Sequence, residues 1–184
     1  MGRTPSRIGL LVGPALALAG CGGGGGPATV PASHAPTTMR VTSPAFASGA
    51  AIPRRFTCAG AGAAPPLRWS GVPARARALA LTVEDPDAPG GTFVHWIVFD
   101  IPASARGLAG ASPPPGAHQA RNSAGSTGWA PPCPPPGRPH RYLLTLYALD
   151  APLSQPNGTN AAIVRAGIAR AAVARGQLVG SFGR

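Results

Sequence analysis

The chain of 184 residues has sixteen basic residues, all of them arginine, against five acidic ones, which gives a formal net charge of +11. A hydrophobic content of 44% is enough for the core of one domain, while 26 glycines and 24 prolines predict many turns and few long helices. The arginines are scattered and no aromatic residues alternate with them, so we exclude a nucleic-acid partner despite the charge. At most, this surface charge favours anionic partners.

Residues 1–20 have the pattern of a secretory signal peptide. Two arginines, Arg3 and Arg7, precede an apolar run from Ile8 to Ala19 that is too short to span a bilayer. The run ends in Leu18-Ala19-Gly20-Cys21, which resembles the lipobox of bacterial lipoproteins, whose cysteine becomes the acylated first residue. We therefore expect signal removal, palmitate or a similar acyl chain on Cys21, and attachment to a membrane of the cell envelope. An ordinary secretory signal followed by a chance cysteine is the alternative.

Cys21 begins a predicted tether over residues 21–38, with five glycines followed by a Pro-, Ala- and Thr-rich stretch. Gly22 stands where an aspartate is associated with inner-membrane retention, so in a bacterium with two membranes we expect the outer membrane, facing the periplasm. One domain follows over residues 39–184. It should begin with an edge strand near Met39 that Pro44 interrupts, and continue with a short strand from Leu67 to Ser70.

The acidic residues are concentrated between two predicted strands. An apolar run from Ala78 to Glu84 predicts the first strand, DPDAPGG predicts a turn, and β-branched and aromatic residues from Thr92 to Ile101 predict the second. Three of the five acidic residues, Glu84, Asp85 and Asp87, fall within four positions. On the acids alone a turn and a functional site are both open, because Asp and Pro are ordinary turn formers. Alternation along the second strand predicts one shared face for Phe93, His95, Ile97 and Phe99.

The later part of the chain predicts an irregular segment, one strong strand, one helix and a final strand. Residues 102–138 are dense in Gly and Pro. The run from His140 to Asp150 is apolar on both faces, which predicts a central strand covered on both sides, with His140, Tyr142, Leu144 and Leu146 on one face. An alanine-rich helix should run from Ala161 to Arg175, capped by Thr159 or Asn160 and ended by Gly176, before a short strand at 177–182.

Several segments together resemble the phosphatidylethanolamine-binding proteins, in particular the bacterial branch called Raf-kinase-inhibitor-like. They are FTCAG, PPLRWSGVP, DPDAPGGTFVHW, PPCPPPGRPHRY, LYALD and LVGSFGR, and they cover about the whole of residues 39–184. The resemblance implies a mainly β fold, an antiparallel β-sandwich with a C-terminal helix. It also implies a binding protein rather than an enzyme, with no cofactor and with a small pocket for phosphate or phospholipid head groups.

The family's pocket carries over onto seven residues: Asp85, Asp87, His95, Pro134, Pro135, His140 and Tyr142. The set suits an anion because imidazoles and a phenol supply N–H and O–H donors. The two carboxylates would repel an anion, so we expect them to accept hydrogen bonds from the imidazoles or from main-chain N–H groups. The chain departs from the family pattern in two places. Phe93 replaces a tryptophan found in some members, and Arg170-Ala171 stand where bacterial relatives often have Gly-His.

Other functions stay open at this point. The main alternative is an inhibitor or interaction module acting on a protein partner such as a protease or kinase, because some members of the family inhibit such enzymes. A metal site built from Asp85, Asp87, His95 and His140 is less favoured, since the close histidine spacing of common zinc motifs is missing. A serine hydrolase is disfavoured because the sequence has no G-x-S-x-G elbow.

Two cysteines, Cys58 and Cys133, remain once Cys21 is acylated. An even pair in an exported protein favours a disulfide. The resemblance places both cysteines near the mouth of the pocket, so a bridge would also hold its rim. Two separate thiols are the alternative.

Overall fold

The computed structural model describes residues 1–2 and 34–184. The predicted signal peptide, Cys21 and most of the tether fall on residues 3–33, so these predictions lie outside the described residues. In the described part, the chain first contacts the domain before Met39, because Ala35 is buried and Thr37 forms a bridge with Arg175. Within the same residues, no helix has the length and apolar character needed to cross a bilayer.

The described strands form two antiparallel sheets. A three-stranded sheet has the order β1-β2-β5, with β1 Arg40–Thr42, β2 Leu67–Ser70 and β5 Gly107–Leu108. A five-stranded sheet has the order β6-β4-β3-β7-β8, with β6 His118–Gln119, β4 Phe93–Pro102, β3 Ala78–Asp85, β7 His140–Leu149 and β8 Ala172–Phe182. A short 3-10 helix, η1, spans Arg54–Phe56, and α1 spans Ala161–Ala171. The predicted mainly β fold with a C-terminal helix is confirmed.

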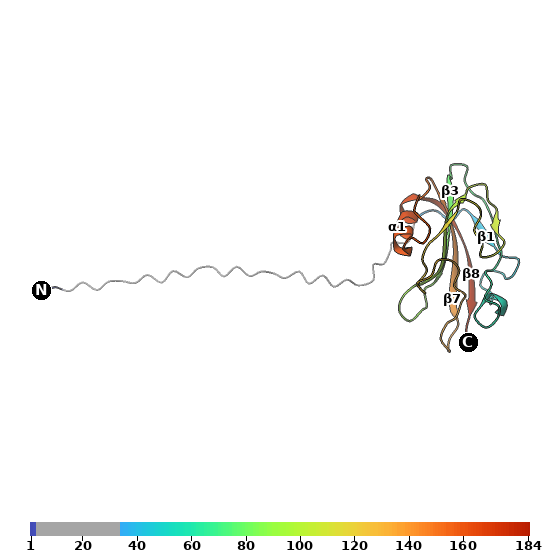
Figure 1. The fold of residues 1–184 in the computed structure, drawn as a ribbon, viewed down its shortest axis with the longest axis horizontal. Helices are drawn as coiled ribbons and strands as arrows, with labels where there is room; N and C mark the ends of the chain where they lie inside the picture. The colour runs from blue at the N-terminus through green and yellow to red at the C-terminus, as the bar shows by residue number, and fades with distance from the viewer. Residues whose placement is uncertain (3–33) are drawn as a thin grey trace.

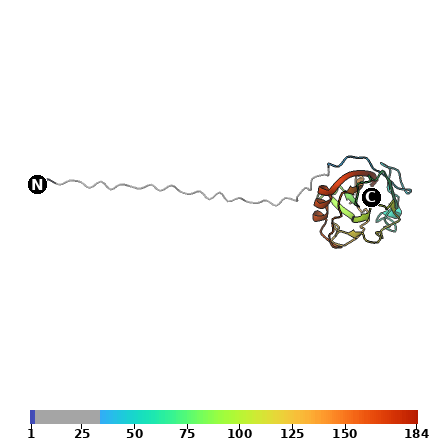
Figure 2. The ribbon, with the colours of Figure 1, turned by 90° about the horizontal axis from the view of Figure 1, so that it is seen from above.

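The five-stranded sheet lies in the middle of the domain and is covered on both faces. In Figure 1, α1 lies on one side of β3, β7 and β8, and β1 lies on the other. The view from above in Figure 2 also places α1 at one side of the domain. A larger core between the two sheets contains Trp69, Trp96 and Tyr142, and a smaller one under α1 contains Phe99 and Val164. Because β7 runs between β3 and β8, its predicted central position is confirmed.

The bounds of the longer strands follow the sequence closely. β2 has the predicted bounds, β3 and β7 differ from the predicted ranges by one residue at one end, and β4 differs by one residue at each end. The strands β5 and β6 lie in the segment 102–138, which we predicted to be irregular. Two-residue strands carry no periodicity from which a sequence pattern could be detected.

The helix is shorter than predicted. α1 ends at Ala171 rather than Arg175, and β8 begins at once with Ala172. Residues 172–182 pair along the whole length of β7, and this pairing with a buried strand outweighs the helix propensity of alanine and arginine. The start of the helix is as predicted, since the side-chain oxygen of Asn160 accepts a hydrogen bond of 2.8 Å from the main-chain N of Ala162.

Gly176 does not end the helix, which corrects a second prediction. It lies within β8, opposite Leu146 of β7. A side chain at this position would meet the main chain of Met39, so glycine is required for the close approach of these two segments.

The alternation of side chains between the two faces of the sheet shifts by one residue at His95 in β4. Val83 of β3 pairs with Trp96 and the next residue, Glu84, pairs with Val94, so His95 is the extra residue of a β-bulge. The prediction that Phe93, His95, Ile97 and Phe99 share one face is therefore wrong. Ile97 and Phe99 pack in the core under α1. The ring of His95 instead contacts those of Phe93 and Tyr142, with centroids 4.7 and 5.3 Å away, because one unpaired residue reverses the alternation that follows it.

Candidate functional site

A cavity of about 370 Å³, which we call the histidine cavity, opens where β3 ends and β7 begins. Five of the seven residues assigned by the resemblance line it: Asp85, His95, Pro134, Pro135 and His140. The remaining lining residues are Ala88, Pro89, Phe93, Ala124, Ala130, Pro131 and Cys133. Three ionisable side chains, brought together from three different strands, therefore face a small and mostly apolar space.

Asp85 shapes both the turn and the cavity. It is the last residue of β3 and is only 3% exposed. Its Oδ1 accepts a hydrogen bond of 2.8 Å from the main-chain N of Asp87, as in an Asx-turn, and its Oδ2 lies 2.7 Å from Nδ1 of His140. Turn and site, which the sequence left as alternatives, are therefore one structure, and both oxygens of this carboxylate are occupied.

Both histidines have Nδ1 committed to an acceptor. In His140, Nδ1 donates to the carboxylate of Asp85, and in His95, Nδ1 donates to the main-chain oxygen of Ala130 at 2.9 Å. A carbonyl or carboxylate oxygen only accepts, so Nδ1 carries the proton in each ring. Each ring leaves Nε2 for a ligand, as an acceptor when the ring is neutral and as a donor when it is protonated.

His95 is protected from solvent, with 5% of its surface exposed. Burial lowers its pKa below the ordinary histidine value, and the bond to Ala130 and the charge of Asp85 oppose this shift only in part. An anion beside Nε2 would favour the protonated ring, so ligand binding and proton uptake at His95 are expected to be linked.

Asp87 does not line the histidine cavity. Its two carboxylate oxygens accept three hydrogen bonds of 2.8 to 2.9 Å from Arg141, two from the guanidinium and one from the main chain. The side-chain and main-chain bonds from Arg141 hold the pKa of Asp87 well below its usual range. The expectation that the two carboxylates are tied up by hydrogen bonds is therefore confirmed, although the partner of Asp87 is an arginine rather than an imidazole.

Tyr142 lies in the core between the two sheets and is not part of the cavity lining. Its ring contacts that of His95, and its hydroxyl is buried without a hydrogen-bond partner among the described residues. Burial raises its pKa, as do the nearby charges of Asp85 and Asp87, so the hydroxyl stays protonated. The role assigned to Tyr142 as a ligand donor stays a prediction.

One wall of the cavity, residues 130–135, contains four prolines, which have no N–H to donate to a neighbouring strand. The wall is instead held through carbonyl oxygens at alternate positions, which accept from three separate parts of the chain. The oxygen of Ala130 accepts from His95, that of Pro132 from the main-chain N of Cys58 at 3.0 Å, and that of Pro134 from Nε of Arg184 at 2.7 Å.

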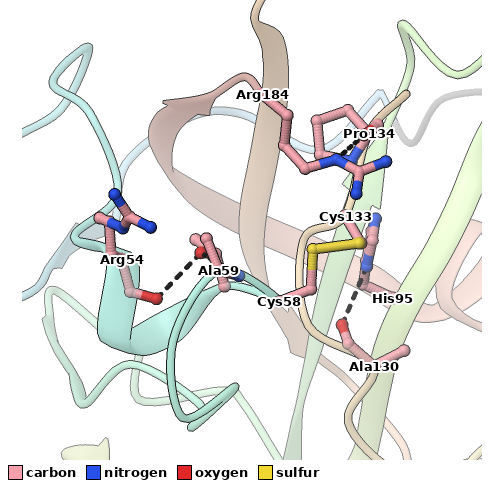
Figure 3. Close-up of a disulfide and its surroundings, with 9 residues drawn as sticks. Arg54, Cys58, Ala59, His95, Ala130, Cys133, Pro134 and Arg184 are labelled. Atoms are coloured by element: carbon pink, nitrogen blue, oxygen red, sulfur yellow. Dashed lines mark hydrogen bonds between the residues drawn. A yellow bond between two sulfur atoms is a disulfide. The ribbon is translucent and has the colours of Figure 1, made fainter. Parts of the chain in front are cut away.

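A disulfide joins Cys58 to Cys133 in this wall, with Cα atoms 5.3 Å apart, which agrees with the predicted pairing (Figure 3). Cys133 also lines the cavity, and both cysteines are exposed to solvent. The bridge therefore fixes the wall to the loop that follows η1.

A sequence profile described as phosphatidylethanolamine-binding protein matches residues 42–183. The chain belongs to the phosphatidylethanolamine-binding protein family. A Mycobacterium tuberculosis protein named as a lipoprotein, LppC, is 44% identical over 183 residues, which cover 91% of this chain and 90% of the relative. A UPF0098 protein of Methanothermobacter thermautotrophicus is 38% identical over 79% of this chain and 99% of its own length.

Two solved structures are similar to this one. A Chlamydia trachomatis protein described as a phosphatidylethanolamine-binding protein homologue has a TM-score of 0.75 and 37% identity, covering 80% of this chain and 99% of its own. Escherichia coli YbcL, described as a member of the mammalian phosphatidylethanolamine-binding protein family, has a TM-score of 0.77 and 30% identity over the same shares.

Some contacts in the site could not have been identified from the sequence. The acceptor that fixes the His95 ring is the main-chain oxygen of Ala130, and a main-chain group leaves no mark on residue type. Arg184 holds the wall from 50 positions away along the chain. Phe93, noted as a replacement for tryptophan, does line the cavity.

The described residues contain no group of three or more His, Cys, Asp or Glu side chains placed to hold a metal ion. His95 and His140 do have the Nδ1 bonds that orient metal-binding imidazoles. Asp85, however, uses both oxygens, and Asp87 is bound by Arg141. A metal in the histidine cavity would have to rely on two imidazole nitrogens.

Proposed function

We propose that this member of the family is a membrane-anchored, non-catalytic binding protein whose histidine cavity takes a phosphate or phospholipid head-group anion. The observation that carries the proposal is the pair of buried imidazoles, each with Nδ1 bonded and Nε2 left for a ligand. Two such nitrogens on fixed rings are suited to donate to neighbouring oxygens of one phosphoryl group when the rings are protonated.

The cavity suits a negative ligand once its histidines are protonated. The carboxylate of Asp85 is stabilised by its two hydrogen bonds, and the charge of Asp87 is paired with that of Arg141. Charged Nε2–H donors facing an anion among proline, alanine and phenylalanine side chains would interact more strongly than in water. Affinity should rise as pH falls, because protonation turns each Nε2 from an acceptor into a donor. The lowered pKa of His95 in the free protein places its contribution at the acidic end of this change.

The lining residues offer no hydroxyl or thiol nucleophile. Among the described residues that line the histidine cavity, none is a serine or threonine. The single cysteine in the lining, Cys133, is held in the disulfide. A bound phosphate ester would meet hydrogen-bond donors but no hydroxyl or thiol nucleophile.

Two observations support the membrane anchor. The Leu18-Ala19-Gly20-Cys21 sequence has the lipobox pattern. The relative named as a lipoprotein matches 91% of the chain, which is more than residues 34–184 alone supply, so the similarity extends into the N-terminal segment.

Titration calorimetry of the full chain with inorganic phosphate, O-phosphoethanolamine and sulfate tests the anion cavity. Measurements at about pH 6 and about pH 8 bracket the ordinary histidine pKa. We expect all three anions to bind more tightly at the lower pH. Sulfate keeps its charge over this range, so its pH dependence isolates protonation of the protein from protonation of the phosphate.

The variant His140→Ala should weaken binding at the lower pH by about tenfold or more, as expected for loss of a charged hydrogen bond. His118→Ala, in β6 and outside the cavity lining, is the matched control and should bind as the unchanged protein does. Binding that requires added zinc and weakens as pH falls would instead indicate a metal site, because protons compete with metals for imidazole.

A further inference from the structure

A second cavity, of about 420 Å³, lies beside the disulfide and is lined by Arg54, Ala59, Phe182, Gly183 and Arg184. It shares no lining residue with the histidine cavity, so it is a separate site. In Figure 3, Arg54 lies to the left of the Cys58–Cys133 bridge and Arg184 lies above it. We call this space the arginine cavity.

Arg184 is held in place at both its side chain and its main chain. Its Nε donates to the oxygen of Pro134 at 2.7 Å, and its main-chain oxygen accepts from the N–H of Gly137 at 3.2 Å. Neither terminal guanidinium nitrogen of Arg184 has a hydrogen bond or ion pair within the described structure. These two nitrogens are free to donate to a ligand, and the bound Nε reduces the entropy lost when they do so.

Arg54 supplies the second cation. Its main-chain oxygen accepts from Thr57, but among the described residues its guanidinium has no hydrogen bond or ion pair. Arg141 and Arg165, by contrast, are paired with Asp87 and Glu84. None of the residues lining the arginine cavity has an acidic side chain, so the lining side chains include two cations and no carboxylate.

We propose that Arg54 and Arg184 form a second oxyanion site, which takes a phosphoryl group and binds independently of the histidine cavity. The planar fork of a guanidinium matches the spacing of phosphate oxygens and stays charged at every relevant pH. The phosphoryl group can belong to a free phosphate or to a phospholipid head group at a bilayer surface. Because Arg184 is hydrogen-bonded to Pro134, which lines the histidine cavity, both anions would be bound at the same end of the domain.

Nuclear magnetic resonance of the arginine Nε–Hε groups tests this site directly. The full chain carrying Cys21→Ser, which removes any acyl anchor, is titrated with inorganic pyrophosphate. We expect saturable shifts of the Arg54 and Arg184 signals that persist when His140→Ala is added. Persistence in that variant separates the arginine cavity from the histidine cavity, so either site can fail without the other.

Arg54→Ala and Arg184→Ala should each weaken pyrophosphate binding by about tenfold, the usual effect of one charged hydrogen bond. Arg68→Ala removes the same charge from an exposed position on β2 and should change nothing. Arg184→Ala also removes the hydrogen bond to Pro134, so its effect could come from either loss. The guanidinium of Arg54 makes no such bond, so weaker binding in Arg54→Ala would come from the lost charge. Shifts of Arg54 and Arg184 no larger than those of Arg68 would overturn the proposal, as would their disappearance in His140→Ala.

Flotation with vesicles distinguishes the two sources of the phosphoryl group. The same chain is mixed with vesicles of phosphatidylcholine alone or with added phosphatidylglycerol. Capture by the phosphatidylglycerol vesicles that is lost in Arg54→Ala supports the site with a lipid head group as its ligand. Saturable pyrophosphate binding without capture supports the site with a soluble phosphate. The absence of both pyrophosphate binding and vesicle capture would contradict the site itself.

Discussion

The Tyr142 side chain combines full burial with a hydroxyl that has no partner among the described residues. A buried hydroxyl left without a hydrogen bond costs about 1–3 kcal/mol. Its raised pKa keeps the group neutral, so the cost is one of missing hydrogen bonds rather than of buried charge. This cost is removed only if a ligand or solvent molecule forms a hydrogen bond with the hydroxyl.

Replacing Tyr142 by phenylalanine should therefore raise the free energy of unfolding of the ligand-free chain by about 1 kcal/mol. Urea unfolding of both proteins measures the difference. Tyr147→Phe removes the hydroxyl of a half-buried tyrosine on the same strand and is the control, which should not gain stability. A loss of stability in Tyr142→Phe would show that the Tyr142 hydroxyl already has a partner.

The pair formed by Asp87 and Arg141 predicts a definite pH dependence of stability. Because Arg141 lowers the pKa of Asp87 in the folded chain, the carboxylate stabilises the fold above its unfolded pKa of about 3.9. That contribution is lost as pH falls through the lower folded value. The Arg141 side chain is 61% exposed, so the effect should be small and should decrease with added salt.

Asp87→Asn should accordingly unfold at a lower urea concentration than the unchanged chain at neutral pH. The gap between the two midpoints should begin to narrow below about pH 4 and should close as pH falls through the lowered pKa of Asp87, where its carboxyl becomes neutral like the amide of the variant. A gap of constant size from neutral to strongly acidic pH would mean that the charge of Asp87 does not contribute.

Among the secondary-structure elements, β3, β4 and β7 were predictable because their periodicity and composition are those of buried strands. The face on which His95 lies was not predictable, because the β-bulge is defined by how β4 pairs with β3 and the bulge has no distinctive residue in β4. The end of α1 was misplaced for a related reason. Residues 172–175 have helix-forming composition, and only their pairing with β7 makes them a strand.

The wall at 130–135 depends on few interactions, and the disulfide is the covalent one. Cys58 and Cys133 are 75 positions apart, and closing such a loop stabilises a fold by about 4 kcal/mol when loop entropy alone is counted. The double variant Cys58→Ser, Cys133→Ser should lose stability of that order in urea unfolding. It should also bind phosphate less tightly, because the wall that carries Pro134 and Pro135 is released.

Cys21→Ser alone is the control for the double variant, since Cys21 takes no part in the bridge, and its urea midpoint should not change. Unchanged phosphate affinity in the double variant, with the stability loss present, would limit the role of the bridge to folding and remove it from the site.

At the scale of the whole molecule, the sequence predicted which segments meet at the cavity, because the DPDAP, histidine-strand and HRY motifs identify the family. It could not predict which of their residues reach the space. Asp87 and Tyr142 were assigned to the pocket with the others. Asp87 instead pairs with Arg141 outside the cavity lining, and Tyr142 packs in the core between the sheets. Contacts between strands determine which side chains reach the cavity, and these contacts cannot be deduced from the residue types of a single sequence.

The anchor is a separate prediction for the whole chain. If the lipobox is used, the unchanged protein fractionates with membranes, and Cys21→Ser stays unprocessed and unacylated. Residues 21–33 would span at most about 45 Å, enough to let the domain turn its cavities toward a bilayer surface. Metabolic labelling with palmitate and cell fractionation measure both effects, with Cys58→Ser as the control that keeps its anchor. Identical processing and labelling of Cys21→Ser and the unchanged chain would rule out acylation at Cys21.

We propose that Nε2 of His95 and Nε2 of His140 bind one anion. Long-range proton–nitrogen spectra of the histidine rings observe these atoms directly in the full chain. Without ligand, both rings should carry their proton on Nδ1, bonded to Ala130 and Asp85. Saturating phosphate should move Nε2 of both rings toward the values of protonated, donating nitrogens. If both Nε2 signals stay unchanged at saturating phosphate, or move only when zinc is added, the anion cavity is wrong.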